Sequence, residues 1–418
     1  MLRIYRDLDM VAPLDDIVIL EIDNWMAAPS AGAVLADMGA TVIKIEPLSG
    51  DPMRKMGRPV KNPDLAEGFK DYDFQFDVDN RGKQSISIAL DQPEGAELVR
   101  KLAAKADIFM CNLLAARQEK FGLGPEAMLK INPRIVHATL TGYGTTGPDA
   151  WRPGYDVTAF FGRSGLYDSS REGDNGVVPM ARPAQGDHTT GLAMVGAILG
   201  ALRMAEKTGE GQVVETSLYE TAVWTQATDY SITAMDHAPV RRRPRHQMLA
   251  ICANRFPCGD GNWVVFNMMP DAAYWPKVAK CLGLEQLLTD QRFVDPSSRY
   301  KNMGTLIDLF DAELAKKSRD EWGKIFDDAG LIWGPVMGLH EVPQDPHAVE
   351  IGMFPKIEHP EHGTYTSVNI PMRFATADVK PRGPAPLNGQ HTDEILALSG
   401  FSEAEIAVLK EAKIVGSN

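Results

Sequence analysis

Short apolar runs alternate with helix-like stretches along the first half of the chain. The runs that read as strands occupy residues 17–22, 41–46, 85–90, 106–112 and 134–144. Helical periodicity follows the first run up to Gly39, spans residues 93–104 and resumes at Pro125. Because strands that alternate with helices form parallel sheets, the sequence predicts an α/β fold with a doubly wound, Rossmann-like sheet.

A long helix is predicted to begin at Asp187. Its apolar residues recur at helical spacing and Gly209 stands just past its end, a position that favours glycine. The residues that set this spacing are Leu192, Val195, Ile198, Leu199 and Leu202. A further strand is predicted over residues 212–218.

The composition changes near residues 236–250, where DHAPVRRRPRHQ is polar, basic and rich in helix breakers. We therefore predict four parts: a large region over 1–225, a linker over 226–249, a smaller α+β domain over 250–333 and a C-terminal segment over 334–418. Within the smaller domain a strand pair is expected around residues 259–261. Ser318, with Glu321 three residues later, forms a capping-box pattern that predicts a helix start.

Charge and cysteine usage narrow the class of protein. Lys plus Arg number 43 against 56 Asp plus Glu, which gives a net charge of −13 and opposes attraction to nucleic acid or anionic lipid. No run of about 18 apolar residues could span a membrane, and residues 1–16 lack the pattern of a secretory signal. Four cysteines without a regular spacing indicate a soluble protein of the reducing cytoplasm.

Dinucleotide and metal signatures are absent. The turn after the first predicted strand carries residues 27–32, Ala-Ala-Pro-Ser-Ala-Gly, in place of GxGxxG, so a nicotinamide or flavin dehydrogenase is not expected. These small residues fit either close approach of a ligand to the backbone or close packing of a helix. His359 and His362 lie three residues apart around a proline, which indicates a surface turn rather than a metal site.

Asp187 is the side chain on which the chemistry depends. It lies in Ala184-Gln-Gly-Asp-His188 at the start of the predicted long helix. One interpretation is an N-cap, in which the carboxylate accepts a bond from a free backbone N–H. The other is a nucleophile, because a helix N-terminus favours an ionised carboxylate and Gly186 leaves room for an electrophile. Position alone does not separate the two.

Several segments together resemble the family III CoA-transferases, the CaiB/BaiF type that includes formyl-CoA transferase and carnitine CoA-transferase. The resemblance runs nearly end to end and is carried by residues 27–54, 79–95, 121–148, 152–160 and 186–218, and by the C-terminal segments DPHAVEIGMF, VNIPMRF and PAPLNGQHTDEIL. It implies a large Rossmann-like domain built from both chain ends, a smaller α+β domain, and a homodimer of two interlocked rings.

The resemblance also implies the site residues. The aspartate nucleophile of the family falls on Asp187. Residues of the coenzyme A site fall on Trp25, Met26, Ala27, Asn80, Arg81, Lys83, Asn112, Lys120 and Tyr143. Lys83 and Lys120 are the cations expected near the phosphates, although a single lysine is more often a solvated surface charge. After Asn112 the family has an aromatic residue and then Arg/Lys-Pro-Gly, whereas this chain reads Leu-Leu-Ala-Ala-Arg117.

The family mechanism implies a CoA-transferase that uses acyl-CoA and a small carboxylic acid, with no metal and no tightly bound cofactor. Two alternatives stay open: a 2-methylacyl-CoA racemase and a CoA-binding subunit of a heteromeric enzyme. Related racemases carry histidine where this chain has Tyr155, and a tyrosine is a poor base at neutral pH. No glycine-rich lid is recognisable over residues 254–260.

The segments AAPSAG, GYDVTAFF and GDHTTG look most like the subgroup that acts on aryl or branched 2-hydroxy and 2-enoyl acids. Trp25, Met26, Phe160 and Phe161 are the expected lining of an apolar acid pocket, with core packing as the alternative for each of them.

Overall fold

The structure is a computed structural model that describes residues 11–58, 60–62, 64 and 66–416. The chain divides into two compact units. Unit 1 comprises residues 1–167, 180–236 and 351–418, and unit 2 comprises residues 168–179 and 237–350. The prediction that no secretory signal is present rests largely on residues 1–10, which lie outside the described residues.

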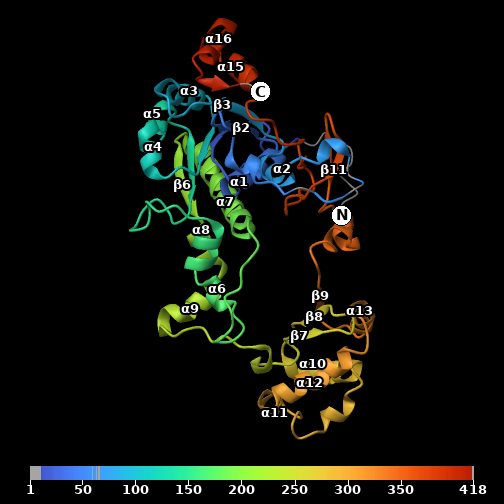
Figure 1. The fold of residues 1–418 in the computed structure, drawn as a ribbon. Helices are drawn as coiled ribbons and strands as arrows, with labels where there is room; N and C mark the ends of the chain where they lie inside the picture. The colour runs from blue at the N-terminus through green and yellow to red at the C-terminus, as the bar shows by residue number, and fades with distance from the viewer. Residues whose placement is uncertain (1–10, 59, 63, 65, 417–418) are drawn as a thin grey trace. The chain divides into compact units, whose positions relative to one another are not determined.

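A seven-stranded sheet forms the centre of unit 1 (Figure 1). Its order is β12 (Val415–Gly416), β3 (Gln84–Ile88), β2 (Thr41–Glu46), β1 (Val18–Ile22), β4 (Ile108–Cys111), β5 (Val136–Thr141) and β6 (Gln212–Ser217). All neighbours pair in parallel except β12, which runs antiparallel to β3. The order of the six parallel strands is that of a doubly wound nucleotide-binding sheet. The predicted parallel α/β sheet is confirmed.

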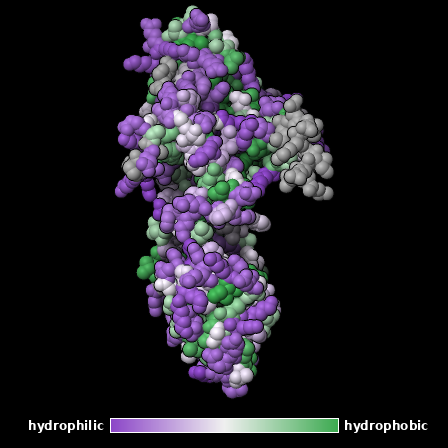
Figure 2. Space-filling view, turned by 90° about the vertical axis from the view of Figure 1, so that its right-hand side faces the viewer, coloured by the Kyte–Doolittle hydropathy of each residue, from purple (hydrophilic) through white to green (hydrophobic). Residues whose placement is uncertain are grey.

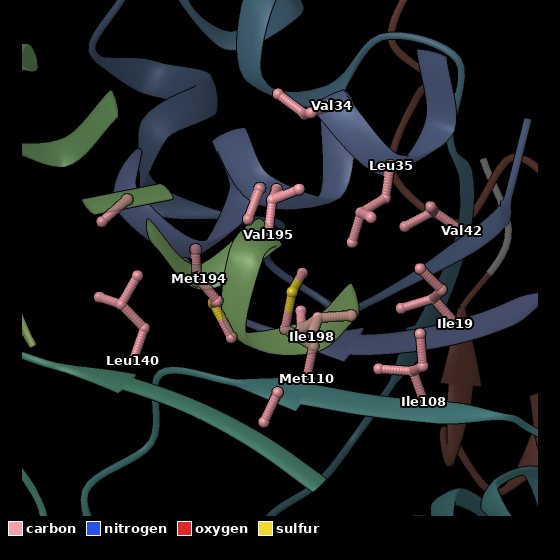
Figure 3. Packing of buried hydrophobic residues seen from close by; sticks show 14 of the residues in the cluster. Ile19, Val34, Leu35, Val42, Ile108, Met110, Leu140, Met194, Val195 and Ile198 are labelled. Carbon is pink, nitrogen blue, oxygen red and sulfur yellow. The ribbon is translucent and has the colours of Figure 1, made fainter. Parts of the chain in front are cut away.

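Alternate residues of the strands point to opposite faces, so each face has its own hydrophobic core. Ile19 packs into one core with α1 (Ala27–Asp37) and α7 (Gln185–Thr208), as Figure 3 shows. Leu20 packs into the other with α3 (Pro93–Ala103), α5 (Pro125–Ile131), α15 (Thr392–Leu398) and α16 (Glu403–Glu411). Helices from both ends of the chain therefore cover the sheet.

Small residues let α1 approach α7 closely. Every residue of α1 is buried. A Cβ added at Gly191 of α7 would lie 2.2 Å from Ser30 Oγ and 2.9 Å from the carbonyl oxygen of Ala27. Helix packing therefore accounts for most of the small residues at 27–32.

The remaining elements of unit 1 are short. They are η1 (Pro52–Lys55), η2 (Glu67–Phe69), α2 (Phe74–Asn80), α4 (Ala115–Phe121), the π-helical turn η3 (Asp156–Arg163), α6 (Leu166–Ser169, which ends in unit 2), α8 (Leu218–Thr225), α9 (Ala227–Asp236), β10 (Lys356–His359) and β11 (Gly363–Thr366). Helix α9 occupies residues predicted to be linker, because the breakers that signalled a linker begin only at residue 237. His359 and His362 stack at the β10–β11 turn with ring centroids 4.2 Å apart.

Unit 2 has its own hydrophobic core and a three-stranded antiparallel sheet of β7 (Arg255–Pro257), β8 (Trp263–Phe266) and β9 (Trp333–Val336). Its helices are η4 (Arg245–Gln247), α10 (Asp271–Cys281), η5 (Glu285–Leu288), α11 (Pro296–Lys301), α12 (Met303–Leu314), α13 (Arg319–Asp328), η6 (Val342–Gln344) and α14 (Pro346–Glu350). The capping box of Ser318 and Glu321 opens α13, as predicted. Residues 254–260 form β7 and the turn toward β8.

On the face that Figure 2 shows, hydrophilic residues dominate and hydrophobic residues occur in separate patches. Within the described ranges no helix is both long enough and apolar enough to cross a bilayer.

Candidate active site

A cavity of about 250 Å³ opens at the carboxyl ends of the central strands of unit 1. Its walls are the loop after β1, the loop after β4, the end of β5, the segment before η3 and the first turn of α7. The lining residues are Asn24, Trp25, Ala27, Asn112, Leu113, Leu114, Arg117, Leu140, Thr141, Gly142, Pro153, Gly154, Tyr155, Asp187 and Leu218. Strand order reverses between β1 and β4, which is where doubly wound sheets bind their ligands.

Asp187 lies in the first turn of α7 and lines this cavity. The helix begins earlier than the sequence predicted: its N-cap is Ala184, which has a φ of +79°, so Asp187 is the third helical residue. No described group donates a hydrogen bond to the carboxylate. The N-cap interpretation is therefore wrong, and the carboxylate is left facing the cavity at the positive end of the helix.

The electrostatic surroundings make this carboxyl unusually basic. Burial first, and then the negative charges of Asp156 and Asp79, raise the pKa of Asp187 to about 7, while His188 acts in the opposite direction. A carboxylate that is stripped of water and left without donors is more basic and more nucleophilic than a solvated one.

Asp156 fixes the start of α7. Its carboxylate accepts a hydrogen bond of 2.8 Å from the backbone N–H of Ala184 and is almost fully buried. Gly186 permits the close contact with η3, because a Cβ there would lie 2.6 Å from Phe160 Cγ and 3.0 Å from Asp156 Cβ. The start of α7 is thus fixed by Asp156, 28 positions before Ala184, and not by Asp187.

The opposite wall is held by the loop after β1. Trp25 adopts a φ of +70°, and its backbone N–H donates to Asp51 Oδ1 at 3.3 Å. Its indole meets the ring of Tyr155 edge-on at 5.7 Å. Asn112 Nδ2 donates to the carbonyl of Asn24 at 2.7 Å, and the N–H of Asn24 donates back to Asn112 Oδ1 at 3.3 Å.

Four of the predicted coenzyme residues lie at or beside this cavity. Trp25, Ala27 and Asn112 line it. Tyr143 follows β5 and lies behind Gly154, where a Cβ would be 2.9 Å from its ring. Met26 instead lines a second cavity of about 590 Å³, together with Val34, Phe74, His188 and Leu192.

Three residues predicted for the coenzyme site lie in the protein interior instead, and they are Asn80, Arg81 and Lys83. Lys83 is fully buried and its ammonium donates to Glu21 Oε1 at 2.6 Å, to the carbonyl of Pro29 and to Asn80 Oδ1. Arg81 is bonded to Asp37 and to the carbonyl of Val368, although its side chain also borders the second cavity. A buried lysine needs a carboxylate partner, so Glu21 holds Lys83 away from any ligand surface.

Lys120 is exposed in the last turn of α4, and its nitrogen lies 5.4 Å from the ring centroid of Phe121. It does not line the cavity, whereas Arg117, one turn earlier on the same helix, does. Arg117 was not among the residues predicted from the sequence, because the motif after Asn112 departs from the family pattern. Its position one helical turn before Lys120 was the available signal.

Phe160 and Phe161 belong to the core beneath α7 and are 4% and 7% exposed. They do not line either cavity, so of the expected acid-pocket residues Trp25 and Met26 alone reach a cavity surface. Among the described residues no group of three or more histidine, cysteine or carboxylate side chains is placed to hold a metal ion.

The fold and site define an α/β protein whose switch-point cavity contains an unpartnered aspartate. The family model for CoA-transferase family III matches residues 14–392, and the chain belongs to this family. It is an enzyme of the CoA-transferase class, whose members use CoA thioesters.

Named relatives support this assignment along the whole chain. The (R)-2-hydroxy-4-methylpentanoate CoA-transferase of Clostridioides difficile is 30% identical over 403 residues, 96% of this chain and 99% of that protein. The cinnamoyl-CoA:phenyllactate CoA-transferase of Clostridium sporogenes is 30% identical and covers 94% of this chain and 95% of its own. A CaiB/BaiF family protein from Brucella suis has a crystal structure with a TM-score of 0.79 at 31% identity, over 93% of this chain and 100% of that one.

Proposed function

We propose that this enzyme transfers coenzyme A from an acyl-CoA to a free carboxylic acid, with Asp187 as the nucleophile. The observation that carries the proposal is a carboxylate in the first turn of α7 that accepts no hydrogen bond from the described residues and faces a cavity at the carboxyl ends of β1, β4 and β5. Burial removes the water that would otherwise weaken the nucleophile.

In the proposed first step an Asp187 oxygen attacks the thioester carbon. The C–S bond breaks, the coenzyme leaves as its thiolate, and an aspartyl-acyl anhydride remains. The thiolate then attacks the Asp187 carbonyl, which expels the first acid as a carboxylate and leaves an aspartyl-CoA thioester. Negative charge that develops in both steps lies near the positive end of α7.

In the second half of the proposed reaction the same steps occur in reverse order with the incoming acid. The incoming carboxylate attacks the aspartyl-CoA carbonyl and forms a new anhydride with release of the thiolate. Attack of the thiolate on the new acyl carbon gives the product acyl-CoA and returns Asp187 to its carboxylate form. Bonds and charge balance without an oxidant or a metal ion, and we propose no tightly bound cofactor.

Trp25, Ala27, Asn112 and Arg117 are the residues we propose for coenzyme binding at the cavity wall. Arg117 supplies the cation there, because guanidinium groups suit phosphate recognition. For Lys120, one turn further along α4, we propose a role near the outer phosphates. Tyr143 supports the wall from behind Gly154.

For the acid we propose aryl or branched 2-hydroxy and 2-enoyl acids. Two of the relatives, those from Clostridioides difficile and Clostridium sporogenes, are named for acids of this kind. The second cavity has apolar walls that include Val34, Phe74 and Leu192, and its His188 directly follows Asp187. Such walls favour a hydrocarbon or aryl group over a short dicarboxylate.

We further propose a homodimer of interlocked rings in the cytoplasm. Helix α9 has no buried residue although it carries Ile232 and Met235, which are 61% and 78% exposed, and Trp224 of α8 is 78% exposed. Apolar helix faces of this kind require a partner surface, and a second copy supplies it. All four cysteines are free thiols, which suits a reducing compartment.

Mass spectrometry of the quenched enzyme tests the nucleophile. After mixing with a panel of acyl-CoAs and digestion, the peptide that contains Asp187 should gain acyl or coenzyme A mass. Asp187→Asn should remove the adduct, and Asp91→Asn in the exposed turn after β3 should not. Adduct formation in Asp187→Asn would contradict the proposal. Deuterium exchange at the α-carbon of a 2-methylacyl-CoA without any adduct would favour the racemase, and binding with neither activity would favour a CoA-binding subunit.

A further inference from the structure

His188, the residue after Asp187, is tied to a buried carboxylate. Its Nε2 lies 2.9 Å from Asp79 Oδ1 in the last turn of α2. The side chain of Asp79 is 2% exposed and that of His188 is 47% exposed. The second oxygen of Asp79 has no hydrogen-bond partner among the described residues. The hydrogen bond to His188 therefore offsets the cost of burying the Asp79 carboxylate away from water.

Negative charge surrounds this imidazole from three elements. Asp79 faces it from α2, Asp156 from η3 and Asp187 from α7 itself. A histidine that is hydrogen-bonded to one carboxylate and feels the negative charge of two more is favoured in its protonated form. Burial alone would lower the pKa of His188, but the hydrogen bond to Asp79 and the nearby negative charges outweigh it, so the pKa lies above its usual range.

The other charged groups of the neighbourhood are engaged elsewhere. Asp77, Arg81 and Tyr365 line the same cavity as His188. Asp77 accepts hydrogen bonds from the hydroxyls of Tyr72 and Tyr365, and Arg81 donates to Asp37. His188 is thus the cation that acts on Asp187, and its charge is the influence that lowers the pKa of that carboxyl.

We propose that Asp79 and His188 form a positioning pair in which the buried carboxylate keeps the imidazole protonated, and the imidazolium keeps Asp187 ionised for attack on the thioester. This inference rests on the proposed function, because it assigns the pair a role only if Asp187 is the nucleophile. The pair touches neither the thioester carbon nor the leaving thiolate. It acts through the charge state of its neighbour.

The pH dependence of kcat/KM for the acyl-CoA tests this role. In His188→Gln the acid limb should move to higher pH by about one unit, since an opposite charge within contact range stabilises a carboxylate by at least that much. Activity below the limb should fall about tenfold while the plateau at high pH is kept. Asp79→Asn should shift the limb in the same direction but by less, because His188 then loses its proton more readily, while removal of the Asp79 charge itself lowers the pKa of Asp187.

His188→Lys keeps a positive charge without the imidazole and should leave the acid limb near its original position. His347→Gln, on the exposed helix α14, is the matched control and should change nothing. A lower plateau in His188→Gln with an unmoved limb would overturn the inference and reduce the pair to a packing role. Adduct formation on Asp187 at high pH distinguishes failure of this inference from failure of the proposed function. All four variants should still form the adduct at high pH if Asp187 is the nucleophile.

Discussion

Asn24 and Asn112 form two hydrogen bonds with each other at the carboxyl ends of β1 and β4. The amide of Asn112 donates to the carbonyl of Asn24 at 2.7 Å and accepts from its N–H at 3.3 Å. Both residues line the cavity of Asp187, and the contact spans the point where the strand order reverses. One side chain thus fixes the spacing between two walls of the cavity.

Asn112→Ala should weaken both stability and substrate binding. Loss of two hydrogen bonds should lower the free energy of unfolding by about 1–3 kcal/mol and raise the KM for acyl-CoA. Asn132→Ala is the matched control, because Asn132 also donates to a carbonyl, that of Ala106, and accepts from a backbone N–H, that of Arg134. Urea unfolding should show similar losses for both variants. An unchanged KM in Asn112→Ala would refute a role at the binding wall.

Arg117→Gln and Lys120→Gln compare two cations on one helix. Arg117 lines the cavity and Lys120 does not, so Arg117→Gln should raise the KM for acyl-CoA about tenfold, a loss of about 1.4 kcal/mol in binding, with little change in kcat. Lys120→Gln should have a smaller effect. Steady-state kinetics at two salt concentrations distinguish the variants, because a phosphate contact weakens with salt. A larger effect of Lys120→Gln would restore the assignment made from sequence.

Asp187→Asn should stabilise the protein while it inactivates it. The pKa of Asp187 is raised to about 7, so the folded state resists its ionised form. Near pH 4 the Asp187 carboxyl of the folded protein stays protonated, and its burial hardly destabilises the fold. Above pH 7 the carboxyl must be ionised in the folded protein as well, so the full cost of the buried charge is present. At pH 8 the free energy of unfolding of the variant should exceed that of the unmodified protein by about 2 kcal/mol. One pKa unit corresponds to about 1.4 kcal/mol, and the sum is reduced because the Asp187 side chain is only partly buried. Denaturant curves at pH 4.5 and pH 8, at one protein concentration, give the two differences. Equal stabilisation at both pH values would contradict this account.

The same titration governs the activity of the unmodified enzyme. Attack requires the carboxylate, so the rate of adduct formation should fall as the pH drops below about 7.

Gly186→Ala should disrupt the start of α7. The added Cβ would meet Phe160 Cγ at 2.6 Å, so either η3 or the helix start must shift, which should cost about 1–3 kcal/mol and much of the activity. Gly196→Ala in the same helix has nothing within 4 Å of its Cβ and should instead stabilise the protein by up to about 1 kcal/mol. Thermal unfolding and adduct yield compare the two. Full activity in Gly186→Ala would show that Asp187 tolerates movement of its helix.

The parallel sheet and helix α7 could be predicted because their apolar periodicity is a local property of the sequence. The true start of α7 could not, since Asp156 caps it from 28 residues away and Ala184 adopts a left-handed conformation that its residue type does not favour. Lys83 illustrates the same limit. Its partner Glu21 is 62 residues distant, and no local pattern separates a buried ion pair from a phosphate ligand.

Arg117 and Lys120 illustrate the same limit on one helix. The family resemblance assigned Lys120 to the coenzyme site, whereas α4 begins at Ala115 and Arg117 is the cation of that helix that lines the cavity. Helix α9 was predicted to be linker because it directly precedes the breaker-rich run that begins at residue 237, and the structure leaves its apolar residues exposed.

Strand β12 pairs with β3, so residues 415–416 hydrogen-bond with strand residues near position 88. During synthesis, all of unit 2 and most of unit 1 emerge from the ribosome before that pairing is possible. Unit 2 has a core of its own and can fold in the interval, whereas one edge of the unit 1 sheet stays open until residues 415–416 arrive. The nascent chain therefore exposes the unpaired edge of β3 while more than 300 further residues are made, and chaperones should act chiefly at that edge.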